Sequence, residues 1–199
     1  MTDERREKKG NDMETINTSI YLRDFKESDA EALATLEYEN REFFQPFTSF
    51  RQEDFYTIPE QLKRIQTFQQ SRQKDETYAK GIFHRASHQL IGTITLSGVV
   101  RDVLQSAWLG YGLDQKHNGK GYTTEAIALM LDEAFHVLDL HRIEAGVQPH
   151  NIGSIRVLEK AGFQKEGLSR QNVKINGEWK DHYLFAILAT DERPHIISK

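Results

Sequence analysis

The chain has 199 residues, 38% of them hydrophobic, and a formal net charge of −4 from 26 Lys and Arg against 30 Asp and Glu. This length suits one domain with a sizeable core, and the near balance of charge carries no whole-chain signature of nucleic-acid binding, although contact with RNA through a local patch stays open. The absence of cysteine excludes disulfides, thiolate metal sites and a cysteine nucleophile.

The sequence predicts a cytoplasmic protein without membrane contact. No apolar run reaches the length of a membrane span, and the charged first residues lack the apolar core of a signal peptide. Residues 1–18 are polar and of mixed charge, so we expect a flexible N-terminal tail. We expect a single domain over 19–190, without repeats or a linker, and a C-terminal tail over 191–199.

The first third of the chain predicts a strand and two helices around an irregular segment. Residues 19–25 favour a strand, and residues 28–40 a helix with Ser28 as N-cap and Glu31 at the capping-box position. Segment 41–60 is rich in phenylalanine but has no helical or strand period, so we expect a loop with short helical turns. Its phenylalanines pack over the core or line a pocket, and the former is the commoner use of Phe. Residues 59–74 predict a helix with Pro59 near its first turn.

Three strands are predicted next. Residues 77–85 and 90–100 indicate a hairpin, and residues 106–114 a third strand. That strand places Ala107, Leu109, Tyr111 and Leu113 on one face, with Trp108, Gly110 and Gly112 on the other. Glycines at alternate strand positions are typical of a bulge or of close approach by a ligand or another chain.

The last third alternates helices and strands. After Gly121 an apolar helical stripe predicts a buried helix. A strand is expected over 141–149, then a helix with Asn151 as N-cap and Gly162 just past its end. Asn176-Gly177 between two strand patterns predicts a hairpin. The helical stripe consists of Ile127, Met130, Leu131, Ala134 and Leu138.

The strand, glycine-rich turn and helix across 110–131 suit a bound phosphate, although a tight turn also uses glycine. The first amides of a helix lack internal partners, and glycine lets the backbone approach an anion. A Walker loop is excluded because Gly121 follows Lys120, and the dinucleotide fingerprint fails at Gln115, where its third glycine belongs.

The stretch Lys116-His117-Asn118-Gly119-Lys120-Gly121 resembles the Arg/Gln-x-x-Gly-x-Gly/Ala motif of the Gcn5-related N-acetyltransferases (the GNAT family), with Lys116 departing at the Arg/Gln place. Residues 124–126, 141–145 and 151–163 are similar to the branch that includes ribosomal-protein N-terminal acetyltransferases. The resemblance runs from about Ile20 to Leu188. It implies an α/β fold with a mixed sheet of about seven strands, flanking helices and splayed central parallel strands.

The resemblance also implies acetyl-CoA as co-substrate, held by main-chain amides. From the residues alone, no metal is expected. We see no trustworthy metal-ligand spacing among the histidines. The coenzyme-binding residues it implies are Leu113, Lys116, His117, Asn118, Gly119, Lys120, Gly121, Tyr122, Thr123 and Asn151.

Acyl transfer needs a donor for the thioester oxygen and a donor for the leaving thiolate. For the oxygen, the resemblance points to residues 111–113, where a bulge would turn an amide toward the thioester, with Leu113 as first choice. The alternative is that the glycines serve only packing or twist. For the thiolate, Ser154 resembles the general-acid serine of the ribosomal branch. Asn151 capping the amide of Ser154 is compatible with that role.

The base and the acceptor contacts are less defined. Glu144 could deprotonate the amine through water, or it could be a structural partner of Arg142 or a helix residue. Asp181 could bind substrate or support strand pairing, and the latter is favoured. His117 is expected beside the nucleotide rather than as a base. The predicted acceptor-binding residues are Phe44, Tyr111 and Asp181.

The leading hypothesis is direct acetyl transfer from acetyl-CoA to an amine. The acceptor would be the N-terminal amine of a protein, with a ribosomal protein as the family-level candidate. An acidic acceptor cleft would instead favour a polyamine or an aminoglycoside, and an amino acid is a further small acceptor. A non-catalytic acyl-CoA sensor is the remaining alternative. A homodimer stays open.

Overall fold

The computed structural model describes residues 18–196. Residues 1–17 of the expected N-terminal tail, and 197–199 of the expected C-terminal one, lie outside the described residues. The domain boundaries therefore stay a prediction.

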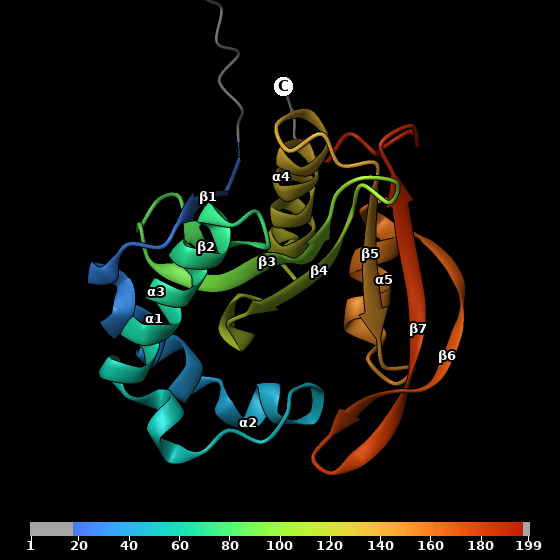
Figure 1. Cartoon of the computed structure of the whole chain (residues 1–199). Helices are drawn as coiled ribbons and strands as arrows, with labels where there is room; N and C mark the ends of the chain where they lie inside the picture. Colours follow the sequence, from blue (N-terminus) through green and yellow to red (C-terminus); the bar gives the residue numbers. More distant parts are fainter. Residues whose placement is uncertain (1–17, 197–199) are drawn as a thin grey trace, which may run out of the picture.

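One mixed sheet organises the described chain, in the order β1-β2-β3-β4-β5-β7-β6 (Figure 1). All neighbours are antiparallel except β4 and β5, which are parallel. The predicted sheet of about seven strands is confirmed. Its strands are β1 (Ile20–Asp24), β2 (Thr77–His84), β3 (Leu90–Val100), β4 (Ser106–Leu113), β5 (Arg142–Val147), β6 (Gln164–Ile175) and β7 (Glu178–Leu188).

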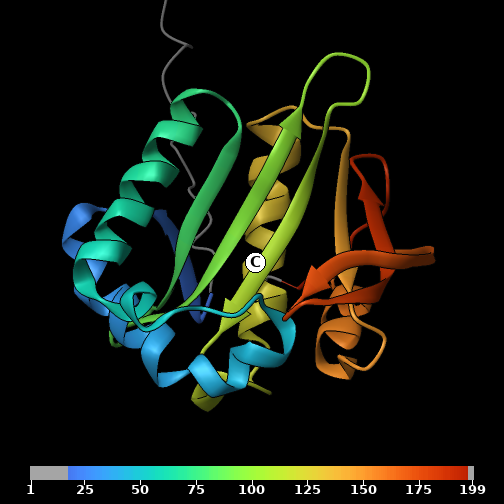
Figure 2. The ribbon, with the colours of Figure 1, turned by 60° about the horizontal axis from the view of Figure 1, so that its bottom comes forward.

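Helices cover both faces of the sheet. On one face, α1 (Ala30–Glu39) and α3 (Ile58–Gln73) pack on each other and on β2 and β3, and on the other lie α4 (Tyr122–His136) and α5 (Ile152–Lys160) (Figures 1 and 2). The expected helical turns in the aromatic segment are α2 (Arg41–Phe44) and two 3-10 turns, Gln45–Phe47 and Glu53–Tyr56.

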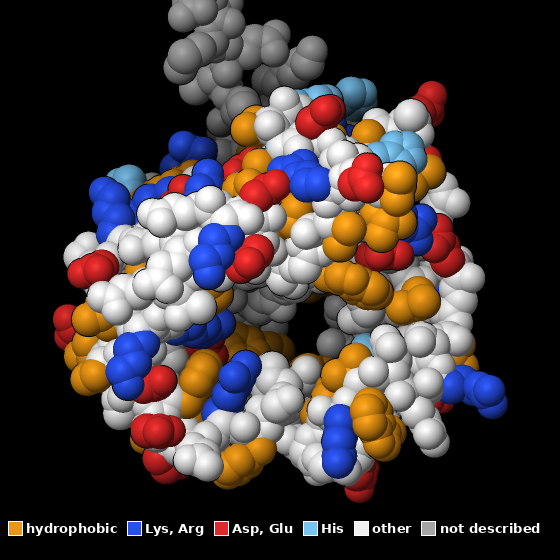
Figure 3. Space-filling model, in the orientation of Figure 1, with side chains coloured by type: hydrophobic (Ala, Val, Ile, Leu, Met, Phe, Trp, Pro, Cys, Tyr) orange, Lys and Arg blue, Asp and Glu red, His pale blue; other side chains and the backbone are white. Residues whose placement is uncertain are grey.

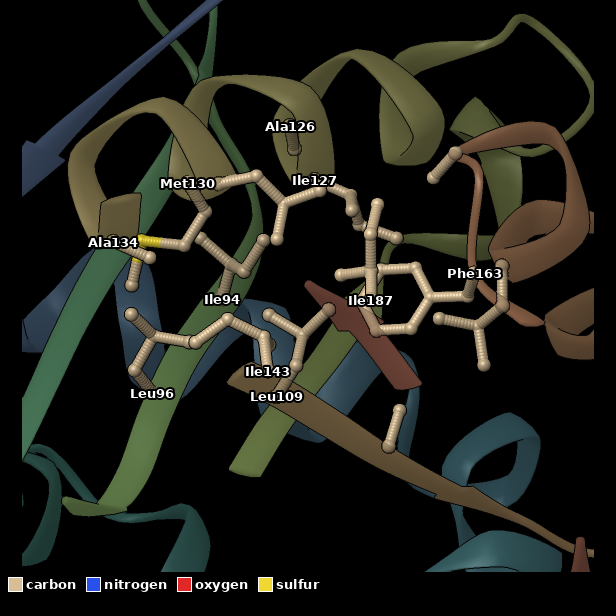
Figure 4. Packing of buried hydrophobic residues seen from close by; sticks show 14 of the residues in the cluster. Ile94, Leu96, Leu109, Ala126, Ile127, Met130, Ala134, Ile143, Phe163 and Ile187 are labelled. Atoms are coloured by element: carbon tan, nitrogen blue, oxygen red, sulfur yellow. The ribbon is translucent and has the colours of Figure 1, made fainter. Parts of the chain in front are cut away.

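The main core lies between α4 and the sheet (Figure 4). Ile127, Met130, Leu131 and Ala134 are buried, which confirms the predicted stripe. Leu138 is only partly buried because α4 ends at His136. Burying each large apolar side chain stabilises the fold by roughly 1.5–3 kcal/mol.

The predicted N-cap at Ser28 is wrong. A 3-10 turn over Glu27–Asp29 precedes α1, and Asp29 occupies the N-cap position without capping by its side chain. Its carboxylate instead accepts bonds from Arg23 at 2.6 and 2.8 Å and from Lys26 N at 2.8 Å. The Arg23 guanidinium lowers the pKa of Asp29. Ser28 therefore lies inside the 3-10 turn, and the Asp29 carboxylate is used by Arg23 and Lys26 and not by the first amides of α1.

The centre of the sheet opens where its parallel strands part. β4 and β5 pair only at Ser106↔Arg142, Ala107↔Ile143 and Trp108↔Glu144. Beyond Trp108, β4 pairs with β3 alone, while β5 stays paired with β7 up to Val147. This confirms the expected splay of the central strands, and Figure 2 shows the two halves of the sheet diverging.

The bulge predicted at 111–113 is wrong. The register between β3 and β4 is unbroken from Gly92↔Leu113 to Ser97↔Trp108 and shifts only between Ser97 and Val100. The shift lies there because Gly98 takes a φ of +59°, which suits a residue without a Cβ.

Candidate active site

A cavity of about 890 Å³ lies along Gly110–Leu113 of β4, past the point where β5 parts from it. It extends from the loop before α4 along β4 to the start of α5, and it reaches the aromatic segment between α1 and α3. We call the cavity-lining residues between Glu37 and Arg64 the front wall. The front wall consists of Glu37, Arg41, Phe43, Phe44, Phe47, Thr48, Arg51, Tyr56 and Arg64.

The glycine loop forms one end of this cavity. Gly119 and Gly121 have φ values of +78° and +83°, in the left-handed region that favours glycine. A Cβ built at either position meets nothing within 4 Å, so the backbone faces open space. The first bond of α4 runs from Glu125 N to Gly121 O at 3.0 Å. The amides of 119–124 donate to no acceptor within the described part of the chain, which leaves them for an anion.

The loop residues before Gly119 are already hydrogen-bonded. Lys116 N donates to Asp114 Oδ1 at 3.2 Å, His117 N to Asp114 O at 2.8 Å, and Asn118 N to Gln115 O at 3.2 Å. The Lys116 ammonium contacts Glu39 at 2.8 Å. The geometry therefore narrows the predicted cradle to amides from Gly119 onward. Of the sequence-predicted coenzyme set, Lys116 and Lys120 do not line the cavity.

The main chain of β4 faces the opening at alternate residues. Asp114 N donates to Ile91 O of β3 at 2.8 Å, and Gln105 O accepts from Arg142 N of β5 at 3.1 Å. Because the two edges of a strand alternate along it, even-numbered residues face β3 and odd-numbered ones face β5. The pair Trp108↔Glu144 uses the amide of Leu109, so the N–H groups that face the opening past it are those of Tyr111 and Leu113.

Ser154 and Tyr111 meet beside this row of amides. Asn151 Oδ1 accepts a bond from Ser154 N at 3.1 Å, so Asn151 caps α5. The Ser154 hydroxyl lies 2.8 Å from the Tyr111 hydroxyl. Both residues line the cavity. Tyr111, predicted to contact the acceptor, thus touches the predicted general acid.

Burial raises the pKa of Tyr111 to about 12, and the bond to Ser154 offsets only part of that rise. The phenol is therefore protonated at any pH near neutrality. It serves as a donor or proton carrier and not as a base.

The structure does not bring Glu144 or Asp181 to the cavity. Glu144 Oε1 accepts bonds from Arg142 Nε and Nη2 at 3.1 and 3.0 Å, and Arg142 also pairs with Glu166. Asp181 Oδ1 accepts from Gln171 N at 2.8 Å, at an irregularity between β6 and β7. For both carboxylates the geometry favours the structural alternative, because each is engaged away from the cavity lining.

The aromatic segment is where sequence reasoning missed most. Phe43, Phe44 and Phe47 line the cavity, as the pocket alternative had it and as expected for Phe44, while Phe50 is 71% exposed; the favoured alternative, packing over the core, is wrong. Phe44 lies over β4, with its ring 3.5 Å from a Cβ built on Gly112. The arginines of the front wall were not anticipated, because on an irregular segment no period shows which side chains point inward.

Residues Gln45, Pro46 and Phe47 cross the open side of the cavity, and we call them the strap. Gln45 Nε2 donates to Asn176 Oδ1 at 3.1 Å, and Gln148 Nε2 donates to Pro46 O at 3.2 Å. The Phe47 ring stacks on His150 at 5.8 Å between centroids. The segment after α1 thereby spans from the glycine loop to the β6–β7 hairpin and the loop before α5. Figure 3 looks into the opening that it borders.

No group of His, Asp and Glu suited to a metal occurs in residues 18–196. Within the same span, no helix has the length and apolar character needed to cross a membrane.

Comparison with known proteins identifies the family to which this fold belongs. The acetyltransferase (GNAT) domain profile matches residues 19–164. A Bacillus subtilis protein named probable N-acetyltransferase YjcK is 53% identical over 174 residues, which cover 87% of this chain and 96% of that protein.

Two solved structures share the fold closely. The ribosomal-protein-S5-alanine acetyltransferase of Vibrio fischeri is 30% identical with a TM-score of 0.82, over 89% of this chain and 97% of that one. Mycobacterium smegmatis RimJ in complex with CoA-disulfide is 29% identical with a TM-score of 0.81, over 85% and 82% of the two chains.

Proposed function

Because the chain belongs to the GNAT family of N-acetyltransferases, we propose that it acetylates the N-terminal amine of a protein, with a ribosomal protein as the first candidate. It is an enzyme of acetyl transfer, so the non-catalytic sensor considered from the sequence is set aside. The acceptor and the residues that act on it are the proposal.

The observation that carries the proposal is that the described lining of the cavity holds one carboxylate and that this carboxylate is already paired with an arginine. Among the lining residues Glu37 is the only carboxylate, and Arg64 Nη1 donates to it at 2.6 Å. A polyamine or an aminoglycoside is a polycation, and this cavity offers it no unpaired acid. An α-amine has a pKa of about 8, against about 10.4 for a lysine amine, so a useful fraction is neutral without a strong base. An N-terminus therefore fits the site better than either small polycation.

The coenzyme would be held by the glycine loop. The amides of 119–124 would cradle its diphosphate, since they face open space at the positive end of α4. Arg156 and Lys160 of α5, which also line the cavity, would supply compensating charge. The opening between β4 and β5 leaves room for the acyl arm beside Leu113 and Ser154.

In the reaction the amine lone pair attacks the thioester carbon, and the C–S bond breaks with its electron pair passing to sulfur. The nitrogen loses one proton and the sulfur gains one, so the transfer balances. Leu113 N–H would donate to the developing oxyanion, because it faces the opening. The Ser154 hydroxyl would donate to the departing sulfur, with the Tyr111 hydroxyl fixing its direction and relaying the proton.

The test is release of free thiol from acetyl-CoA with a panel of amines. The panel holds a peptide that begins with Ala or Ser, the same peptide with its N-terminus blocked but a lysine retained, spermidine and an aminoglycoside. We expect release only with the free N-terminus. A faster reaction with spermidine or with the blocked peptide would overturn the proposal.

The pH dependence gives an independent reading. For a peptide acceptor, kcat/KM should rise with pH and level off near pH 8, because only the neutral α-amine reacts. No fall is expected up to about pH 10, since Tyr111, with its pKa near 12, keeps its proton. A rate that keeps rising through pH 10 would indicate a lysine-like amine instead.

A further inference from the structure

The front wall is positively charged although the whole chain is acidic. The formal net charge is −4. The charged residues that line the cavity are nonetheless mostly basic: Arg41, Arg51, Arg64, Arg156 and Lys160 against Glu37. The last two basic residues belong to α5, across the opening, so the front wall itself holds three arginines.

One of these arginines is neutralised. Arg64 Nη1 lies 2.6 Å from Glu37 Oε1, and the two side chains are 26% and 14% exposed. Arg64 also donates to Gln61 Oε1 at 3.2 Å. This pair adds polarity to the wall but no net charge.

The other two arginines keep their charge. Arg41 lies over the Tyr38 ring at 4.1 Å and donates to Tyr38 O at 2.8 Å. Within residues 18–196, its only carboxylate contact is Glu42 at 3.8 Å, whose side chain is 91% exposed and so contributes little. Arg51 lies over the Phe55 ring at 4.4 Å and forms no ion pair with any described residue.

The two arginines lie over rings that both contact Tyr56. Burial is the main cause of a raised pKa at Tyr56, Glu37 adds to the rise, and Arg51 and Arg41 act against it. The ring under Arg41, that of Tyr38, lies 6.1 Å from the Tyr56 ring between centroids, and the ring under Arg51, that of Phe55, lies 5.3 Å from it. Tyr56 itself lines the cavity. The wall thus presents two unneutralised guanidinium groups, a phenol and three phenylalanine rings on one surface.

We infer that Arg41 and Arg51 bind a carboxylate close to the reacting amine, so that the preferred acceptor is a protein N-terminus with Asp or Glu among its first few residues. This rests on the proposed function and narrows its acceptor. Guanidinium groups fixed on aromatic rings present their N–H forks to a carboxylate with little loss of side-chain freedom. A lysine at the same place in the acceptor meets like charge.

The test compares octapeptides that differ at one residue. Each begins with Ala and carries Glu, Gln or Lys at the second, third or fourth position. Thiol release is followed at saturating acetyl-CoA with the full chain. We expect kcat/KM to favour Glu over Gln by about tenfold at one of these positions, with Lys slowest.

Charge reversal makes the assignment specific. Arg51→Glu should invert the order, so that the Lys peptide becomes a better acceptor than the Glu peptide. Arg170→Glu makes the same charge change on an exposed residue of β6 outside the cavity lining, and it should leave the order as in the parent.

The outcomes separate this inference from the function beneath it. Equal rates for the Glu, Gln and Lys peptides at every one of the three positions would overturn the inference while acetylation of N-termini stands. A higher KM for acetyl-CoA in Arg51→Glu, with peptide preference unchanged, would assign the arginine to the coenzyme and overturn it too. Reaction with spermidine and with none of the peptides would sink the proposed function itself.

Discussion

The two ends of the cavity, the glycine loop and the front wall, would bind their ligands through different parts of the chain. The glycine loop offers main-chain N–H groups, and the positions of its glycines are set by backbone angles. The front wall offers side chains, most of them from the segment between α1 and α3, held by stacking and flanked by the pair of Arg64 on α3 with Glu37 on α1. Binding by the glycine loop therefore depends on where its glycines stand in the sequence. Side chains of the front wall can be exchanged for others without altering the fold, so the chemistry of that end can change.

The largest effect is expected where the loop meets a bound anion. Gly119→Glu should weaken acetyl-CoA binding by about 10²-fold or more, because a carboxylate would stand at the anion cradle. Gly119→Ala is the matched control, since it carries the same cost of positive φ without the charge. Calorimetry with acetyl-CoA on both variants separates the effect of the carboxylate from the cost of a side chain at positive φ. Equal affinity in Gly119→Glu and the parent protein would remove the cradle from the coenzyme site.

The second largest effect is expected for Ser154, which lines the cavity between the glycine loop and the front wall. Ser154→Ala should lower kcat on the order of 10²-fold, as loss of a proton donor typically does. The KM for acetyl-CoA should hardly change, because the diphosphate contacts are elsewhere. Ser154→Thr, which keeps a hydroxyl, should recover much of the rate. Unaltered turnover in the alanine variant would take Ser154 out of the mechanism.

Tyr111→Phe should have a smaller effect, a fall in kcat of about tenfold, since it removes only the hydroxyl that bonds Ser154. The double variant with Ser154→Ala should lose no more than Ser154→Ala alone, because residues that act as one unit are not additive. Steady-state kinetics on the four proteins completes the cycle. Independent, additive losses would mean that Tyr111 does not act through Ser154.

The smallest effect is expected outside both ends. Glu144→Gln should leave kcat within about twofold of the parent, because the carboxylate contacts Arg142 and not the cavity. The melting temperature should fall only slightly, since Arg142 keeps Glu166 and exposed ion pairs contribute little. A large loss of kcat with an intact fold would instead restore Glu144 as the base.

The contrast between the glycine loop and the front wall also explains which features of the structure could be predicted from the sequence. Strand and helix positions followed from periodicity, as in the stripe of α4, and the turn at Asn176-Gly177 from its dipeptide, which takes φ values of +53° and +84°. The glycine loop could be located because Gly119 and Gly121 need backbone angles that other residues resist.

Other features depended on contacts between distant segments. Asp29 and not Ser28 precedes α1, and its carboxylate bonds Arg23 of β1, six residues away in the sequence. The inward direction of Arg41 and Arg51 comes from rings that hold them, and no local pattern encodes it. The contact of Tyr111 with Ser154 joins residues 43 positions apart.

The strap has a consequence for what enters the cavity. Its contacts with Asn176, Gln148 and His150 join it to the β6–β7 hairpin and to the loop before α5, so it crosses the mouth of the cavity. A crossing segment of this kind would favour an extended chain end over a folded segment. If the acceptor is a protein, its terminus must be reached while it is still unstructured, either during synthesis or as a permanently loose end.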